Sequence, residues 1–167
     1  QLPGGDSGWV SDPAALAEYD ALVEAFVAAV SAVWPDCVIQ WEDFKQQNAL
    51  RILDRYRERV PSFNDDVQGT AAIVVTGVIS ALRALELPVR DARIVLVGAG
   101  AAGTGIARML RMLLAEEGVP AEVIAGAVIA VDSRGLVHAG RDDLDAGKRD
   151  LAVPAVDGPT PDLLETV

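Results

Sequence analysis

The chain has 167 residues, of which 51% are hydrophobic and 23% charged, and its formal net charge is −11. This length and composition support a folded region with a real core, and they exclude a disordered chain or a disulfide-stapled mini-protein. With 14 basic residues against 25 acidic ones, neither a nucleic-acid surface nor an anionic membrane surface is expected. The lone Cys37 and the lack of a charged-then-apolar leader predict a reducing compartment, the cytoplasm. The single His138 excludes a multi-histidine zinc site.

The first part of the chain predicts two helices separated by a short strand. Asp12 before Pro13 is typical of a helix N-terminus, and apolar residues at helical spacing continue through residues 16–33. The apolar run 37–41 predicts a buried strand. Residues 49–56 predict a second amphipathic helix. The chain opens without a methionine, so we expect it to begin inside a longer gene product.

Residues 68–85 predict a helix that is apolar almost all round, which favours a buried position. Gly77 within it would let another backbone come close. The longest apolar run, residues 71–82, is broken by Thr76 and Ser80 and is too short to cross a bilayer, so no membrane span is expected.

The segments 93–97 and 128–132 predict neighbouring parallel strands, joined by a helix over residues 103–117 in a right-handed crossover. We expect the sheet edge beside 128–132 to stand open. The chain becomes polar and loop-rich after Gly135, and a further helix is predicted to start near Thr160. The fold class is therefore α/β, with a partial Rossmann-type parallel sheet and helices on both faces.

A glycine turn between the strand at 93–97 and the following helix is typical of a dinucleotide-binding fingerprint. Gly98 permits a tight turn, Gly100 lets the backbone approach a pyrophosphate, and Gly103 lets helix and strand pack closely. The helix N-terminus offers free N–H donors and a partial positive charge to phosphates. The predicted binding residues of the turn are Gly98, Ala99, Gly100, Ala101, Ala102 and Gly103.

Asp132, at the end of the next strand, lies where a ribose-binding acid belongs. A carboxylate there favours a free 2′-hydroxyl, whereas Ser133 and Arg134 could hold a 2′-phosphate. Lys148 and Arg149 could reach the same place. The alternative is that these residues are solvated loop charges. Both NAD and NADP stay open, with NADP favoured.

Acidic residues gather at two element ends, Glu42 and Asp43 after a strand and Asp65 and Asp66 before a helix. Such hard oxygen ligands suit Mg²⁺ or Mn²⁺. Both Glu42 and Asp43 can face one ion only if the backbone leaves the strand between them, because successive strand residues point to opposite faces. Acidic residues at element ends also cap helices or face water, so spacing alone leaves both interpretations open.

Three blocks of the sequence resemble the malic enzyme family. They are residues 39–44 with 48–49 and 55–57, the run Phe-Asn-Asp-Asp-Val-Gln-Gly-Thr-Ala at 63–71, and the glycine turn at 97–107. The resemblance covers about residues 19–149, and the Asn-Asp-Asp-Val-Gln-Gly-Thr run is highly specific. It implies that residues 1–66 are the end of a malate and metal domain with α/β structure, and that residues 67–167 are the front of an NAD(P)-binding Rossmann domain.

The resemblance also implies functional roles. Glu42, Asp43 and Asp66 match the family's divalent-cation ligands, Asp65 its neighbouring active-site aspartate, and Asp132 its ribose acid. The implied reaction is oxidative decarboxylation of malate to pyruvate and CO₂ with reduction of NAD(P)⁺, in a complete enzyme that is a dimer or tetramer. The alternatives are a malolactic enzyme, which releases lactate, and a non-catalytic nucleotide-binding fragment.

The sequence departs from the family pattern in its first 41 residues. The family's general base is a lysine and its general acid a tyrosine, both well before the Glu-Asp pair, yet none of these 41 residues is lysine. Tyr19 lies on the apolar side of a predicted helix and is a poor acid. We therefore expect the isolated chain to be inactive.

Overall fold

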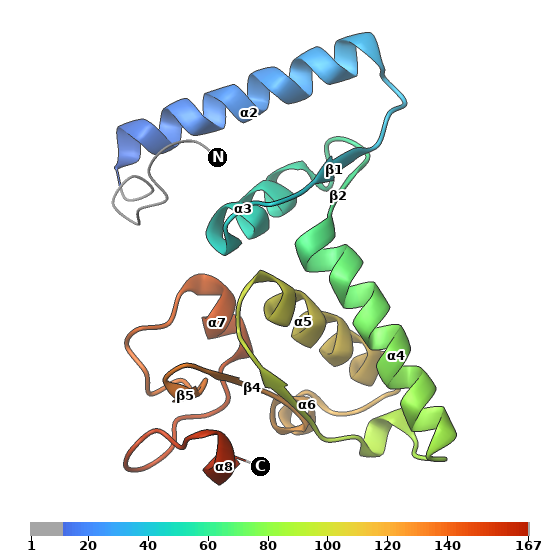
Figure 1. Ribbon diagram of the computed structural model, residues 1–167, viewed down its shortest axis with the longest axis vertical. Helices are drawn as coiled ribbons and strands as arrows, with labels where there is room; N and C mark the ends of the chain where they lie inside the picture. The colour runs from blue at the N-terminus through green and yellow to red at the C-terminus, as the bar shows by residue number, and fades with distance from the viewer. Residues whose placement is uncertain (1–11, 167) are drawn as a thin grey trace. The chain divides into compact units, whose positions relative to one another are not determined.

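The computed structural model describes residues 12–166, and the chain divides into two compact units, one ending at Ile39 and one beginning at Gln40. The first unit is built on helix α2 (Pro13–Val33; Figure 1). Asp12 caps this helix by accepting a 3.0 Å hydrogen bond from the Ala14 N–H, and proline occupies the first turn. The prediction for this helix is confirmed.

A strand, a helix and a second strand come first in the second unit, and the acidic residues directly follow the two strands. Strands β1 (Ile39–Trp41) and β2 (Ser62–Asn64) pair, and α3 (Gln46–Tyr56) connects them. The side chains of β1 alternate buried, exposed, buried. Trp41 packs its ring 5.6 Å from that of Tyr56, so the end of the strand is anchored on the helix.

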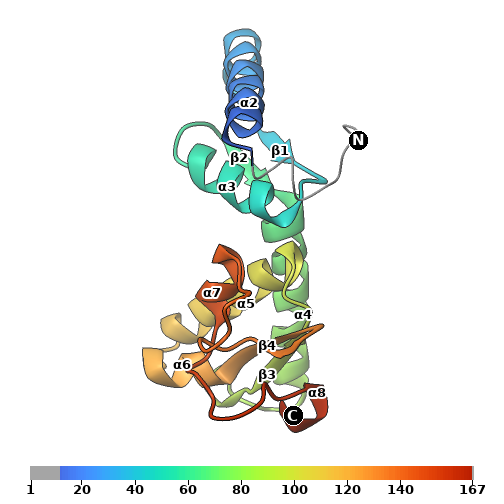
Figure 2. The same cartoon turned by 90° about the vertical axis from the view of Figure 1, so that its left-hand side faces the viewer.

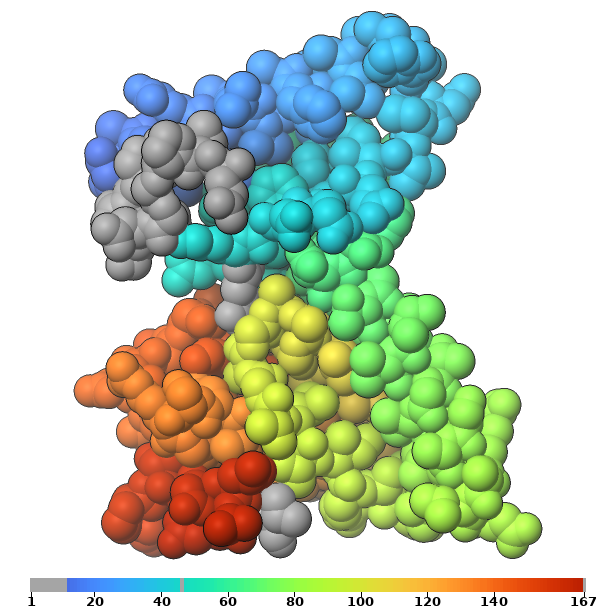
Figure 3. Space-filling view, in the orientation of Figure 1, coloured from blue at the N-terminus to red at the C-terminus, as the bar shows by residue number. Residues whose placement is uncertain are grey.

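A π-helical turn, η1 (Asp65–Gly69), leads into α4 (Thr70–Ala84). The expectation that this helix is buried is wrong: Ala71 and Val75 face α5 in the core, but Ile73 is 77% exposed. Figure 3 shows α4, in green, at the surface. An apolar composition favours burial but supplies no partner for the second face of a helix.

Two expectations tied to α4 also change. An added Cβ at Gly77 would meet nothing within 4 Å, so no backbone from residues 12–166 packs closely there. The helical stretch Asp65–Ala84 has 20 residues, so length alone no longer excludes a membrane span. Two aspartates open this stretch and one face packs on α5, which is the arrangement of a helix at the edge of an α/β fold.

The sheet of the second unit has the order β3 (Ile94–Val97), β4 (Val128–Asp132) and β5 (Gly135–Leu136), as Figure 2 shows in part. β3 and β4 are parallel with Ile94 opposite Val128, which confirms the predicted pairing, and β5 is antiparallel to β4. β4 is therefore the central strand, and the expectation of an open edge beside it is wrong. β3 and β5 are the two edge strands, because the short hairpin after Asp132 places β5 beside Val131 and Asp132 of β4.

Helices pack around this sheet, and a short 3₁₀ turn precedes it. The elements are η2 (Val89–Asp91), α5 (Ala101–Glu116), α6 (Ala121–Ala127), α7 (Ala146–Leu151) and α8 (Leu163–Thr166). One apolar core joins α4, α5, α6, β4 and α7, with Leu110 and Val128 almost fully buried. The connection between α5 and β4 contains the short helix α6. The architecture is α/β with a partial Rossmann-type parallel sheet.

Candidate functional site

The glycine turn lies between the end of β3 and the start of α5. Gly98 has a φ of +118°, which favours glycine because it carries no Cβ, and its N–H donates a 2.8 Å hydrogen bond to the Val131 carbonyl of β4. A Cβ at Gly103 would collide with the Gly98 carbonyl oxygen. Gly100, in contrast, faces open space and precedes the first helical residue, Ala101. The turn therefore fits tightly on its protein side and is free where a ligand would approach.

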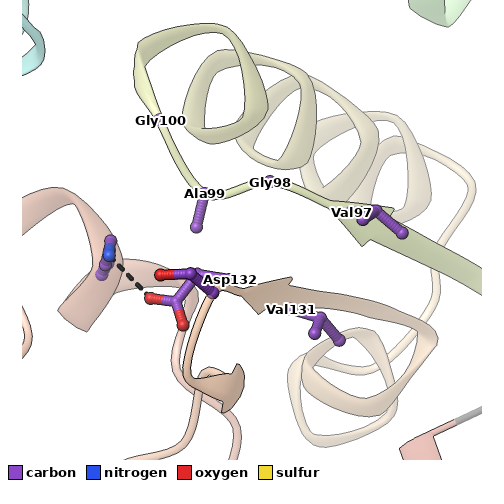
Figure 4. Close-up of a pocket in the computed structure, with 8 residues that line it drawn as sticks. Val97, Gly98, Ala99, Gly100, Val131 and Asp132 are labelled. Atoms are coloured by element: carbon purple, nitrogen blue, oxygen red, sulfur yellow. Dashed lines mark hydrogen bonds and ion pairs between the residues drawn. The ribbon is translucent and has the colours of Figure 1, made fainter. Parts of the chain in front are cut away.

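A cavity of about 440 Å³ opens beside this turn at the carboxyl ends of β3 and β4. Figure 4 shows the Gly98–Gly100 turn above Asp132, with the Ala99 side chain pointing toward the space between them. The crevice at the carboxyl ends of parallel strands is where open α/β sheets bind ligands. The residues that line it are Val97, Gly98, Ala99, Gly100, Val131, Asp132, Ser133 and Lys148.

Asp132 is held by two cations at the floor of the cavity. Arg141 binds both of its oxygens, at 2.9 Å and 3.0 Å, and Lys148 Nζ lies 2.6 Å from Oδ2. The Arg134 N–H also donates to Oδ1. Burial alone would raise the pKa of Asp132, but these hydrogen bonds outweigh it and hold the pKa well below its usual range. The carboxylate is therefore ionised and fixed in position.

The four polar residues expected near a 2′-phosphate have different positions. Ser133 and Lys148 line the cavity. The Arg134 side chain is 69% exposed and pairs with Asp143 at 3.2 Å. The Arg149 Nε donates a hydrogen bond to the Leu144 carbonyl, and of Lys148 and Arg149 it is Lys148 that lines the cavity.

The acidic residues of the two element ends come together. Glu42, Asp43 and Asp66 place one carboxylate oxygen each within 4.8 Å of one another. β1 ends at Trp41 and Asp43 has a φ of +59°, so the backbone leaves the strand as a shared ion requires. The Asp43 N–H donates a 3.1 Å hydrogen bond to Asp66 Oδ2, which joins the two segments. Three hard oxygen donors of this kind fit Mg²⁺ or Mn²⁺.

Asp65 lies beside this cluster on the turn η1, half-buried. A Cβ at Gly69 would collide with its carboxylate, so the glycine makes room for that side chain. Ala101, at the start of α5, packs against an apolar cluster of Leu50, Leu53 and Val67. This contact places the first turn of α5 against the elements that carry the acidic cluster, so the glycine turn and the carboxylates belong to one packed region.

Sequence reasoning missed four residues that position these groups. Arg141 and Asp143 complete the ion-pair network around Asp132, and Asn64 and Gln68 form hydrogen bonds at the ends of η1. For Asn64 and Gln68 a signal was available, because an Asn followed by a Gln just before an apolar run is similar to a helix-capping pattern. For Arg141 there was none, since its contact depends on how the chain folds back after β5.

The family models show where these features belong. The description "Malic enzyme, NAD binding domain" matches residues 67–159, and "Malic enzyme, N-terminal domain" matches residues 7–57. The chain belongs to the malic enzyme family. It carries a nicotinamide-nucleotide binding region of that family of oxidoreductases, together with part of the N-terminal domain.

Two curated malic enzymes are equally similar to this chain. The NAD-dependent malic enzyme of Vibrio campbellii is 42% identical over 137 residues, covering 82% of this chain and 24% of the relative. The human NADP-dependent malic enzyme is 42% identical over 136 residues, covering 81% and 24%. The chain thus spans about a quarter of the length of the curated malic enzymes that it matches. Because one relative is named for NAD and the other for NADP, overall identity does not decide between the two nucleotides.

Solved malic enzyme structures have the same fold. The NAD-dependent malic enzyme of Thermotoga maritima has a TM-score of 0.66 at 28% identity, covering 86% of this chain and 37% of that one. The Entamoeba histolytica malic enzyme has a TM-score of 0.67 at 27% identity, covering 96% and 31%. These likenesses agree with the partial Rossmann-type fold of the second unit.

Proposed function

We propose that this chain is the central part of a metal-dependent malic enzyme that converts malate to pyruvate and CO₂ while reducing NAD(P)⁺. The observation that carries the proposal is the meeting of Glu42, Asp43 and Asp66 in the same packed region as the glycine turn. On this proposal residues 1–66 end the malate and metal domain, and residues 67–167 begin the nucleotide-binding domain.

The acidic cluster is proposed to hold Mg²⁺ or Mn²⁺, with Asp65 as the neighbouring active-site acid. Glu42 and Asp43 are exposed and Asp66 is half-buried. The three carboxylates therefore keep most of their hydration while the site is empty, and a bound cation can replace part of it. A bound divalent cation supplies Lewis acidity, which favours loss of the proton from a 2-hydroxyl and stabilises negative charge on a neighbouring oxygen. The residues of this chain supply the anchoring oxygens.

The glycine turn is proposed to bind the pyrophosphate of the dinucleotide. The open side of Gly100 admits the phosphate oxygens, and the first N–H groups of the 16-residue helix α5 face that side of the turn. Asp132 is ionised and fixed by Arg141, so it can accept a hydrogen bond from a ribose hydroxyl without first having to lose a proton.

NADP⁺ is the favoured nucleotide of this proposal. Lys148 and Ser133 line the cavity beside Asp132, and Arg134 stands next to them. Three cations, Arg134, Arg141 and Lys148, face two carboxylates, Asp132 and Asp143, so the cluster carries a net charge of +1. That surplus favours a 2′-phosphate over a bare 2′-hydroxyl.

The cation site is tested by titrating the purified chain with Mn²⁺ and following the electron paramagnetic resonance signal of the free ion. We expect one bound equivalent in the wild type and at least a tenfold loss of affinity in Asp66→Asn, because a ligand charge is removed. Asp157→Asn, an exposed aspartate far along the chain, is the matched control. Equal binding by the wild type and Asp66→Asn would contradict the proposed site.

The reaction is tested by assaying the products formed from malate by a gene product that contains this chain. Pyruvate with NAD(P)H indicates a malic enzyme, and lactate indicates a malolactic enzyme.

A further inference from the structure

The turn η1, which carries both Asp65 and Asp66, is fixed at its start by two reciprocal hydrogen bonds. Asn64 Oδ1 accepts from the Val67 N–H at 2.8 Å, and Gln68 Oε1 accepts from the Asn64 N–H at 2.9 Å. This is the pattern of a helix capping box, with the returning side chain four residues on because η1 is a wider π-helical turn.

Asn64 has no accessible surface, which fixes the orientation of its amide. The Val67 N–H is a donor, so the amide atom that faces it must be the oxygen. Within residues 12–166 the Asn64 Nδ2 has no hydrogen-bond partner. A rotation of the amide would leave the Val67 N–H without its acceptor as well, which is unfavourable for a buried donor. The buried amide holds the first turn in one conformation.

The other side of η1 packs closely against helix α5. A Cβ at Gly105 of α5 would collide with the Val67 carbonyl, so only glycine lets the turn approach that helix so closely. Val67 itself is 3% exposed. The turn is thus held by α5 on one side and by the Asn64–Gln68 hydrogen bonds at its start.

The position of η1 is transmitted to the second acidic segment through one bond. Asp66 Oδ2 accepts the Asp43 N–H at 3.1 Å, and Asp43 has a φ of +59°, which is uncommon for a residue other than glycine. The backbone at Asp43 is strained, and the hydrogen bond to Asp66 Oδ2 keeps it in this conformation. A shift of Asp66 would release Asp43 and change the separation of the carboxylates.

We propose that Asn64 and Gln68 are positioning residues, which set the distance between Asp66 and the Glu42–Asp43 corner before any cation binds. The proposal deepens the proposed cation site and rests on it for its functional meaning, but the positioning itself is a property of the chain alone. Gln68 is exposed, so its side chain can be changed without opening the core.

The test uses solvent saturation-transfer NMR on the whole 167-residue chain, with amide exchange read at Asn64 and Asp43. In Gln68→Ala we expect exchange at both amides to rise roughly fivefold to tenfold, because the Asn64 amide loses its acceptor and Asp66, the acceptor of the Asp43 amide, is held less firmly. Gln68→Glu keeps an acceptor oxygen and should restore slow exchange. Gln47→Ala, an exposed glutamine on α3, is the matched control and should leave both amides unchanged.

Mn²⁺ affinity of the same variants supplies the second measurement. We expect Gln68→Ala to weaken Mn²⁺ binding about threefold to tenfold with an unchanged midpoint of thermal unfolding, and Gln68→Glu to restore it. Unchanged exchange at Asp43 in Gln68→Ala overturns the positioning proposal whatever the metal does. If exchange at Asp43 rises but the wild type binds no Mn²⁺, the positioning proposal stands and the proposed cation site fails.

Discussion

Arg141 and Asp132 form a bidentate ion pair at the floor of the cavity beside the glycine turn, with nitrogen–oxygen distances of 2.9 Å and 3.0 Å. Their side chains are 5% and 8% exposed. Arg141 also reaches Asp143 at 2.7 Å, and the two carboxylates raise its pKa above the usual range, Asp143 most strongly. The arginine therefore stays charged and fixes the acid that ends β4.

Arg141→Met is expected to destabilise the chain by about 3 kcal/mol at pH 7, because it leaves a buried carboxylate with one cation fewer. Lys148 remains beside Asp132 and keeps the loss from being larger. Urea unfolding followed by circular dichroism measures the change. Arg90→Met, at an exposed arginine, is the control and should stay within about 0.5 kcal/mol of the wild type. An equally small effect of Arg141→Met would contradict a structural role for the pair.

The same network predicts how stability depends on acid pH. The pKa of Asp143 is lowered to about 2, mainly by its hydrogen bonds with Arg141, and that of Asp132 is lowered as well. An unfolded aspartate titrates near pH 3.9, so the unfolded chain takes up protons first as pH falls. The contribution of the network is fully present above about pH 5 and is lost progressively toward pH 2. Urea unfolding at pH 7, 4 and 3 should show a smaller decline in Arg141→Met than in the wild type.

Gly100→Ala and Gly103→Ala are expected to separate ligand binding from stability. A methyl group at Gly100 meets nothing in the protein, so folding should be kept while close approach of a pyrophosphate is blocked. A methyl group at Gly103 strikes the Gly98 carbonyl and should cost about 2 kcal/mol or more of stability. Thermal unfolding and fluorescence titration with NADP⁺ measure the two effects. Full NADP⁺ affinity in Gly100→Ala would argue against the turn as the phosphate site.

The acidic and glycine-rich parts of the site could be predicted from the sequence because their chemistry is local. Gly98 and Gly103 occupy positions where backbone geometry admits only glycine, and Asp66 lies in a run with a distinctive order of residues. The partners of Asp132 could not be predicted as readily, since Arg141 returns to it through a turn nine residues later. Arg149 follows Lys148 directly, yet only Lys148 reaches the acid, because neighbouring residues on α7 point in different directions.

The exposed face of α4 could not be predicted for a different reason. Hydropathy shows that Ile73 favours burial, but it does not tell which element covers it. For His138, predicted only to lie in a polar loop, the structure shows a buried ring 2.9 Å from Thr160 Oγ1. That contact joins residues 22 apart and leaves no local pattern. Contacts between residues far apart in the sequence cannot be predicted from periodicity along the chain.

Arg134→Ala is expected to weaken NADP⁺ binding about fivefold and NAD⁺ binding less than twofold. The arginine is 69% exposed beside the cavity, so its contribution is limited to a solvent-screened contact with the 2′-phosphate. Isothermal titration with both nucleotides measures the difference. Arg90→Ala controls for the loss of one positive charge from the whole chain, and equal losses for both nucleotides would refute the preference for NADP⁺.

The isolated 167-residue chain is expected not to turn malate over. No lysine precedes Glu42, where the malic enzyme resemblance implies a general base, and a missing general base or acid typically costs about 10²–10⁴ in rate. A malate-dependent NAD(P)H absorbance assay with Mn²⁺ checks this, with a complete malic enzyme as the positive control. Tyr56 has no exposed surface and is covered by Trp41 and the Arg59 guanidinium, so it does not reach a substrate. Turnover within tenfold of the complete enzyme would mean that the chain supplies its own base, and Lys45, exposed beside the Glu42–Asp43 corner, is then the first residue to substitute.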